Sequence, residues 1–361
     1  MVPVANRPLL EHVVEAVAAA GVDELVLVVG YNRDRIQTHF GDGDDFGVDI
    51  EYAIQNHQLG TGHAVAQATG AVDEEFLVLN GDRLIEPGIV DAVLEADPDA
   101  AATVAVTRVD DPSRYGVVTA SGDELVDIDE KPVGEPESEV INAGVYRFDR
   151  RVFDAIEVTD PNPAGEIELT TALLKLAEDA RVSVAPYRGR WRDVSQLWDL
   201  LTVNDEVVGT DGGIESDRIH PSAVVDDRCA VAPDSRIGPN AVVGGGSAVG
   251  RNVTIGANAV VSNAVVFPDA SVDDGAVVRD CVVAANATVG PNATVEGGAA
   301  TVVVEGVVYE DVVLGAVLGD NARLGGGATL DPGTVVGDDA LIGSGARVSG
   351  WIDPGTAVRR G

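Results

Sequence analysis

The chain has 361 residues, enough for two ordinary domains, and no stretch reaches the about 18 consecutive apolar residues of a membrane span. Sixty acidic residues against 24 basic ones give a formal charge of -36, which disfavours nucleic acid as a partner. The acid is spread along the whole sequence, so we expect a solvated surface adapted to high salt. The N-terminal residues do not resemble a signal peptide, and we expect a cytoplasmic protein. Cys229 and Cys281 are too few for a disulfide framework and are expected to be small buried residues.

The first predicted helix follows Pro8 and ends before Gly21. Its apolar residues recur one helical turn apart, at Leu10, Val13, Val14 and Val17. The next run, ELVLVVG at 24–30, is predicted to be a buried strand. A helix followed by such a strand implies a parallel α/β sheet, and a sheet of this kind normally starts with a strand of its own. No such strand precedes the helix, and the pattern alone leaves open where the first strand of the sheet lies.

A glycine-rich turn comes next, with Gly60, Thr61 and Gly62 between a strand ending near Ile54 and a helix beginning around His63. Backbone amides at the start of a helix lack intrahelical partners and can bind a base edge or a phosphate. The same residues would equally suit a tight turn with no ligand. The histidines of this stretch, His57 and His63, lack a companion for a metal site, so we expect them to form hydrogen bonds or to pack.

Two aspartates are predicted at the ends of apolar segments. Asp82 follows the strand FLVLNGD, and ligands of open α/β sheets bind beyond the carboxyl ends of the strands. A carboxylate there can hold Mg²⁺ against a phosphate, or it can simply belong to a turn. Asp193, in WRDV, is a second candidate ligand or else the N-cap of the following helix. Two such ligands would suit in-line displacement at phosphorus.

Polar residues at strand edges form a further candidate group. Glu130 and Asn142, in EKPVG and INAG, are placed where a hydroxyl-rich ligand could be held. Lys131 lies beside Glu130 and is one of only two lysines in the chain. Each residue alone is a weak signal.

After residue 205 the pattern changes, first to a glycine- and aspartate-rich linker at 206–218 and then to a six-residue period. Aliphatic residues occupy every sixth position in three runs: Ile219, Val225, Val231, Ile237, Val243, Val249, Ile255 and Val261; Val277, Val283, Val289 and Val295; and Val312, Leu318, Leu324, Leu330, Val336, Ile342 and Val348. Glycine follows many of these residues. This period, with compact residues at the corners, is typical of a parallel β-helix, whereas a sandwich would show period two and hairpin signals.

The stretches QLGTGHA, NGD, YG, EKP, INAG, GEIELT and WRDV, in this order, resemble the sugar-1-phosphate nucleotidyltransferases. The similarity is greatest to archaeal members with a left-handed β-helix, akin to N-acetylglucosamine-1-phosphate uridylyltransferase and glucose-1-phosphate thymidylyltransferase. The resemblance implies a Rossmann-like α/β domain at 1–205, a linker at 206–218 and a left-handed β-helix at 219–361. In that family a sugar 1-phosphate attacks the α-phosphorus of a nucleoside triphosphate, and an NDP-sugar and pyrophosphate form without a covalent enzyme intermediate.

The resemblance also implies roles for individual residues. Gln55, Gly60 and Thr61 would contact the nucleobase, and Asp82 and Asp193 would hold Mg²⁺. The residues implied around the sugar are Gly116, Glu130, Lys131, Asn142, Glu166 and Thr170. The substrates would be UTP or dTTP with glucose 1-phosphate or N-acetylglucosamine 1-phosphate.

Members of the family begin with a strand, a glycine-rich triphosphate loop and a Lys-Pro pair that this sequence lacks. We expect Met1 to be an internal methionine mistaken for the start. The alternative is a truncated protein that binds sugar nucleotides or assembles with others and turns over poorly. Acetyl transfer by the β-helix is disfavoured because it needs a histidine base and no histidine follows His220. We expect the β-helix to make a homotrimer instead.

Overall fold

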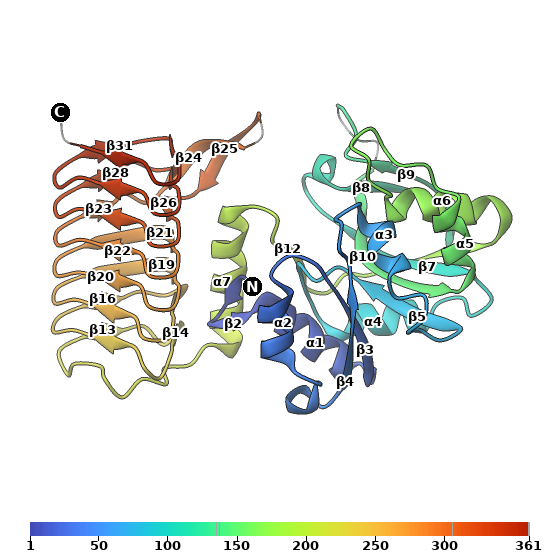
Figure 1. Ribbon diagram of the computed structural model, residues 1–361, viewed down its shortest axis with the longest axis horizontal. Coiled ribbons are helices and arrows are strands. Elements are labelled where there is room, and N and C mark those ends of the chain that lie inside the picture. Colours follow the sequence, from blue (N-terminus) through green and yellow to red (C-terminus); the bar gives the residue numbers. More distant parts are fainter. Residues whose placement is uncertain (135, 137, 305, 360–361) are drawn as a thin grey trace. The chain divides into compact units, whose positions relative to one another are not determined.

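The computed structural model describes residues 1–134, 136, 138–304 and 306–359, which form two compact units (Figure 1). Unit 1 comprises Met1 and Leu9–Asp193, and unit 2 comprises Val2–Pro8 and the chain from Val194 onward. The domain boundary expected at residue 205 falls inside helix α7, Leu197–Asp211, and the expected linker starts in the same helix. The structure therefore divides the chain earlier than the sequence pattern indicated, because α7 packs on the β-helix.

The main sheet of unit 1 contains both parallel and antiparallel strand pairs, whereas the sequence pattern predicted a parallel sheet. Over the described residues its order is β5-β10-β7-β11-β9-β8, with bounds Glu75–Leu79, Val140–Asp149, Ala102–Arg108, Val182–Pro186, Glu124–Glu130 and Gly116–Ser121. Strands β7 and β11 are parallel, whereas β10 runs antiparallel to β5 and β7. The antiparallel part arises because β8, β9 and β10 follow one another without a helical crossover.

Two short strand pairs complete the β-structure of unit 1. Strands β3, Glu24–Val29, and β4, Asp49–Ile54, are parallel, and β6, Arg83–Ile85, and β12, Trp191–Asp193, are antiparallel. The strand predicted at 24–30 is thus confirmed. Among the described residues β3 pairs only with β4, and β5 only with β10, so each keeps one edge without a strand neighbour.

Helices cover both faces of the main sheet. Their bounds are Leu9–Ala19 for α1, Arg33–Phe40 for α2, Thr61–Ala66 for α3, Pro87–Leu94 for α4, Arg151–Glu157 for α5 and Leu169–Asp179 for α6, with 3-10 turns at Asp44–Phe46 and Pro112–Arg114. Successive residues of β10 point to opposite faces: Val145 packs in the core beneath α1 and α4, and Tyr146 packs in the core beneath α5 and α6. The predicted first helix is confirmed as α1. None of the helices in the described part of the chain is long and apolar enough to cross a membrane.

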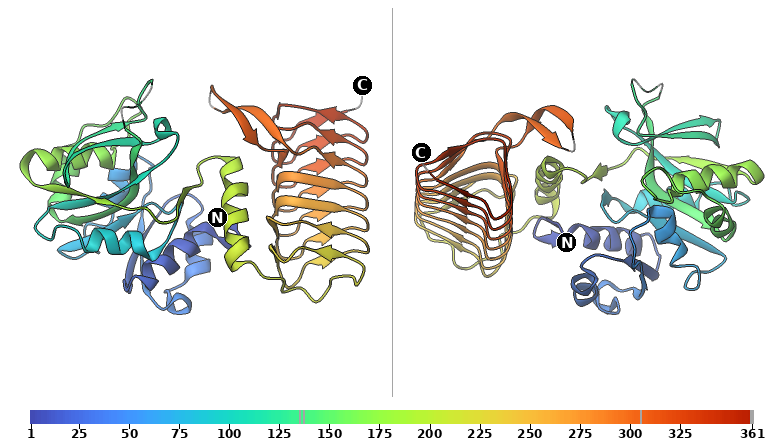
Figure 2. Two further views of the ribbon diagram at one scale, coloured as in Figure 1. Left: turned by 180° about the vertical axis from the view of Figure 1, so that it is seen from behind. Right: turned by 45° about the horizontal axis from the view of Figure 1, so that its top comes forward.

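Unit 2 is a parallel β-helix whose coils stack in register (Figures 1 and 2). Val225 pairs with Val243, and Ile237 with Ile255, so a full turn takes three six-residue faces. The strands are β13 Val224–Val225, β14 Cys229–Val231, β15 Arg236–Ile237, β16 Val242–Val243, β17 Ser247–Val249, β18 Thr254–Ile255, β19 Val260–Val266, β20 Ser271–Val272, β21 Val277–Val283, β22 Thr288–Val289, β23 Thr294–Val295, β24 Ala299–Val304, β25 Val307–Val313, β26 Ala316–Leu318, β27 Arg323–Leu324, β28 Thr329–Leu330, β29 Thr334–Val336, β30 Leu341–Ile342, β31 Arg347–Val348, β32 Trp351–Ile352 and β33 Ala357–Val358.

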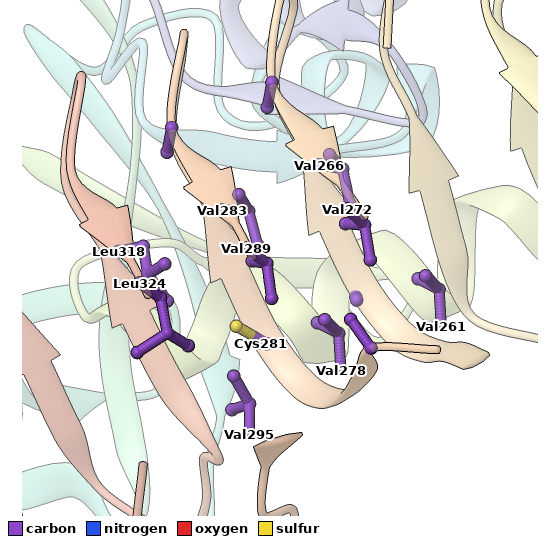
Figure 3. Close-up of a cluster of buried hydrophobic side chains, with 14 of the residues drawn as sticks. Val261, Val266, Val272, Val278, Cys281, Val283, Val289, Val295, Leu318 and Leu324 are labelled. Atoms are coloured by element: carbon purple, nitrogen blue, oxygen red, sulfur yellow. The ribbon is translucent and has the colours of Figure 1, made fainter. Parts of the chain in front are cut away.

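At all but two of the predicted positions the residue lies in the buried core of the β-helix or, for Ile219 and Val225, packs against it. In the second run the core residue is Val278, which is fully buried, and Val277 is only half-buried (Figure 3). In the third run Val312 belongs to the hairpin β24–β25, which interrupts the coils. Both cysteines are buried and free as predicted, and burial raises the pKa of the Cys229 thiol to about 11.

Helix α7 is fastened to the β-helix by buried polar contacts within unit 2. Asn204 is fully buried; its Nδ2 donates to the carbonyl oxygen of Gly246 at 2.9 Å, and its Oδ1 accepts from the backbone N–H of Ala5 at 2.9 Å. Ala5 lies in the turn between β1, Pro3–Val4, and β2, Arg7–Pro8. These contacts explain why residues 2–8 and α7 belong to the same unit as the β-helix.

Candidate active site

A bulge in β10 is the organising element of the site. The register of β10 against β7 shifts between Asn142 and Tyr146. Within the bulge, Asn142 Oδ1 accepts from the backbone N–H of Gly144 at 2.9 Å, and Asn142 Nδ2 donates to the Tyr146 hydroxyl oxygen at 2.6 Å. Burial raises the pKa of Tyr146 to about 12, so its hydroxyl keeps its proton and remains a donor. Gly144 has φ 73°, a conformation that favours glycine.

Two other motifs dock on this bulge. The backbone N–H of Asn80 donates to the Gly144 carbonyl oxygen at 3.0 Å, and the Trp191 Nε1–H donates to the Ala143 carbonyl oxygen at 2.8 Å. Asn80 belongs to NGD and Trp191 to WRDV. NGD and WRDV, which are far apart in the sequence, therefore meet at INAG.

The two predicted metal ligands converge on one arginine. In the β6–β12 pair Arg83 lies directly opposite Asp193, and Arg83 Nη1 contacts Asp193 Oδ1. Arg83 Nε lies 3.7 Å from Asp82 Oδ1. The Asp193 side chain is 5% exposed and that of Asp82 is 59% exposed. Asp193 does not cap α7, whose capping box uses Gln196 and Asp199, so that alternative is wrong.

The donor set suits Mg²⁺, with one condition. Two carboxylates supply hard oxygen ligands, and the exposed side of Asp82 leaves room for water and phosphate. No third His, Cys, Asp or Glu joins the pair to form a larger ligand cluster among the residues the structure describes. The condition is that the ion binds in spite of the positive charge of Arg83, which is in contact with Asp193 Oδ1.

The predicted sugar residues gather around Glu130. Gly116 and Glu130 are opposite each other in the β8–β9 pair, and a Cβ at Gly116 would lie 2.7 Å from Glu130 Oε2. Thr170 is hydrogen-bonded to the Glu130 carboxylate. Desolvation first, and then the like charge of Glu168, raise the pKa of Glu130. The charge of Arg83 lowers the pKa of both Glu130 and Tyr146. The residues around Glu130 therefore lie in the same region as Asp82 and Asp193.

Two further predicted sugar residues, Lys131 and Glu166, are exposed, and Glu168 takes a place that was not predicted. Lys131 is exposed with φ 48°, and its backbone N–H donates to the Tyr115 carbonyl oxygen at 3.0 Å. Glu166 is exposed, and its backbone N–H donates to Asn162 Oδ1 at 3.0 Å. Glu168, which we did not single out from the sequence, is the acidic residue that acts on Glu130. Glu168 is the second Glu of the motif GEIELT, so the motif itself could have pointed to it.

The glycine-rich turn is a tight turn that also connects helix α3 to the start of helix α6. Gly60 has φ 95°, and a Cβ there would lie 2.5 Å from the Ile167 carbonyl oxygen. The Thr61 hydroxyl accepts from the backbone N–H of Leu169, the first residue of α6, at 3.1 Å. Helix α3 starts at Thr61, two residues before the predicted start. Thr61 thus anchors the helix that carries Thr170.

A cavity of about 530 Å³ lies beside Gln55, within the range of small-molecule sites. It is lined by Gly30, Tyr31, Arg33, Ile54, Gln55, Asn56, His57, Gln58 and Leu59. Gln55 Nε2 donates to the Gly60 carbonyl oxygen at 3.2 Å and lies 3.0 Å from His63 Nδ1. His63 is therefore a hydrogen-bonding residue, as expected. The Gln55 amide is oriented by the turn, next to a space large enough for a nucleoside.

Comparisons with known proteins decide the family. Residues 1–209 match the model of the family described as nucleotidyl transferase. The chain belongs to this family. Residues 214–317 match the GMPPB C-terminal domain, and residues 315–350 match the bacterial transferase hexapeptide repeats, in agreement with a left-handed β-helix. The predicted family and fold class are confirmed.

Curated relatives of this nucleotidyl transferase include enzymes from archaea and bacteria. A bifunctional protein GlmU from Methanococcus maripaludis is 35% identical over 65% of this chain and 57% of its own length. The low-salt glycan biosynthesis nucleotidyltransferase Agl11 from Haloferax volcanii is 34% identical over 64% of this chain and 66% of its own. A glucose-1-phosphate thymidylyltransferase from Streptomyces antibioticus is 36% identical over 58% and 60%. The chain thus spans between about half and two thirds of the length of these relatives.

A solved structure supports the fold of the nucleotidyl transferase unit. It is a Bacillus anthracis protein described as a glucose-1-phosphate thymidylyltransferase, with a TM-score of 0.53 and 24% sequence identity. The similarity covers 58% of this chain and 87% of that chain.

Proposed function

We propose that this nucleotidyl transferase joins a nucleoside triphosphate, UTP or dTTP, to glucose 1-phosphate or N-acetylglucosamine 1-phosphate, giving an NDP-sugar and pyrophosphate. One observation carries the proposal: Asp82 and Asp193, from distant motifs, meet at Arg83 next to the group around Glu130. Carboxylates beside a hydroxyl-binding group suit a reaction between a phosphate and a sugar. The thymidylyltransferase among the relatives supports dTTP and glucose 1-phosphate as one substrate pair.

The proposed reaction needs positioning and charge neutralisation more than it needs acid–base chemistry. A phosphate oxygen of the sugar 1-phosphate bonds to the α-phosphorus, the bond from that phosphorus to the bridging oxygen breaks, and pyrophosphate leaves with the electron pair. Mg²⁺ held by Asp82 and Asp193 would neutralise phosphate charge. The chain itself would orient the sugar hydroxyls through Glu130, Asn142 and Thr170.

The nucleobase side supports a base with an N–H donor. The side-chain N–H groups of Gln55 face Gly60 and His63, so its Oε1 is the atom left to accept. Uracil and thymine both present a ring N–H next to carbonyl oxygens. This matches the proposed choice of UTP or dTTP, with the base in the cavity beside Gln55.

Pyrophosphate release in molar KCl with Mg²⁺ tests the proposal. We expect turnover in the native chain, and a loss of about two orders of magnitude or more in Asp82→Asn and Asp193→Asn, since each change removes a charge at the reacting phosphates. Asp34→Asn is the matched control, because the Asp34 side chain is 94% exposed on α2, and it should leave turnover unchanged. Binding of an NDP-sugar without any pyrophosphate release would contradict the proposal and favour a binding protein.

We also propose that the chain forms a homotrimer through the β-helix. Its flat faces repeat from coil to coil, which makes regular surfaces suited to symmetric packing. The mass of the particle in solution tests this assembly.

A further inference from the structure

Arg83 occupies an unusual position for the residue after a predicted metal ligand. It lies in β6 directly opposite Asp193 in β12, and side chains opposite one another in an antiparallel pair share a face. Its guanidinium group contacts Asp193 Oδ1, and its Nε lies 3.7 Å from Asp82 Oδ1. One cationic side chain therefore serves both carboxylates.

Aromatic rings hold this guanidinium in place. Its central carbon lies 5.3 Å from the centre of the Trp191 ring and 6.0 Å from that of Tyr115, and the Arg83 side chain is only 14% exposed. Trp191 is itself fixed by its hydrogen bond to the Ala143 carbonyl oxygen. The contact is thus a packed, partly desolvated ion pair.

The burial of Asp193 requires a counter-charge. Its side chain is 5% exposed, and an ionised carboxylate at that depth is stable only when it is paired. In this structure Arg83 supplies the pairing charge. The guanidinium group in contact with Asp193 Oδ1 places a positive charge beside any metal ion that binds the same carboxylate, and like charges repel.

We propose that Arg83 is an internal cation that competes with the divalent cation for Asp193, and so sets the concentration at which that ion binds. This inference rests on the proposed function, which makes Asp82 and Asp193 the metal ligands. The ion then binds Asp193 against the positive charge of the guanidinium group, which the Trp191 and Tyr115 rings hold close to it. The chain consequently binds divalent cations more weakly than an uncompensated pair of carboxylates would.

Mn²⁺ binding to the full chain in molar KCl, measured as free Mn²⁺ by electron paramagnetic resonance, tests the inference without substrates. Arg83→Met should tighten Mn²⁺ binding about tenfold or more, because a like charge next to the ion is removed. Arg190→Met is the matched control: Arg190 Nε pairs with Glu86 at 3.5 Å, so this variant should bind Mn²⁺ as the native chain does. The gain should disappear when Asp193→Asn is added to Arg83→Met, which separates this site from the rest of the acidic surface.

Equal or weaker Mn²⁺ binding by a folded Arg83→Met chain would overturn the inference. If that variant does not fold because Asp193 is left unpaired, Arg83→Gln gives the answer. Glutamine keeps N–H donors for the Asp193 carboxylate but carries no charge, so we expect tighter binding than in the native chain; no gain there overturns the inference as well. A gain in Mn²⁺ affinity with no pyrophosphate release in the native chain would instead leave the inference standing and reject the proposed function.

Discussion

Glu130 is held close to Gly116, and its surroundings make it sensitive to pH. Desolvation and the like charge of Glu168 raise its pKa, so the folded chain binds this proton more tightly than the unfolded chain does. This tighter proton binding adds to the free energy of unfolding. The contribution is fully present below the ordinary Glu pKa of about 4.3 and is lost as the pH rises through the raised pKa of the folded chain. At neutral pH the charged Glu130 therefore lowers the free energy of unfolding. Glu130 retains exposed surface, so the effect is expected to be modest.

The pH dependence gives a test of this arrangement. Glu130→Gln should raise the melting temperature at pH 7 and change it less at pH 4, where both states are increasingly protonated. Thermal unfolding followed by circular dichroism at both pH values measures this. In a Glu168→Gln background the gain at pH 7 should shrink, because one of the two causes is gone. A destabilising effect of Glu130→Gln at pH 7 would contradict the prediction.

Some residues of the candidate site could be predicted from the sequence, and others could not. The resemblance to the family implied that Asp82 and Asp193 act together, and both lie beside Arg83. The choice between Glu166 and Glu168 could not be made in advance, because two residues of an irregular segment differ only in where the fold turns their side chains. The pairing of Arg83 with Asp193 depends on the register of β6 against β12, which only the folded chain defines.

At the scale of elements, the corners of the β-helix leave no room for side chains at certain positions. The backbone N–H of Gly315 donates to the Asp280 carbonyl oxygen at 2.6 Å, and a Cβ added at Gly315 would overlap the Arg279 carbonyl oxygen and lie 2.9 Å from that of Glu296. Gly315→Ala should therefore cost about 3 kcal/mol or more of stability, the upper end of overpacking effects. Urea denaturation measures this. Gly213→Ala, at a glycine with open space around it, should change little, and equal effects of the two variants would argue against this packing.

The elements also show why periodicity works in one unit better than in the other. In the β-helix each aliphatic residue has a fixed place in a repeating coil, so counting in sixes found the core. The count fails at Val277 and Val312, where a shortened corner and the hairpin β24–β25 shift the register. In unit 1 the pattern predicted α1 and β3 but could not reveal that β10 runs antiparallel to β7, since pairing direction is not written in a strand's own sequence.

At the scale of the whole molecule, the charge of -36 acts against both folding and assembly. Copies brought together as a trimer repel one another unless mobile ions screen the charge, and the screening length falls from about 8 Å at 0.15 M salt to about 3 Å at 1 M. Light scattering should therefore give three times the chain mass in molar KCl and smaller species at low salt. A monomer at every salt concentration would reject the trimer.

The stacking of the coils has a consequence for how such a chain can change over evolutionary time. Since every coil pairs only with its immediate neighbours, the gain or loss of one complete turn leaves the remaining ladder intact. The β24–β25 hairpin is a second kind of insertion, an outgrowth and not a turn, and the ladder tolerates it because β22 still pairs with β27 across it. The stacked architecture is thus compatible with β-helices that are longer, shorter or decorated with hairpins.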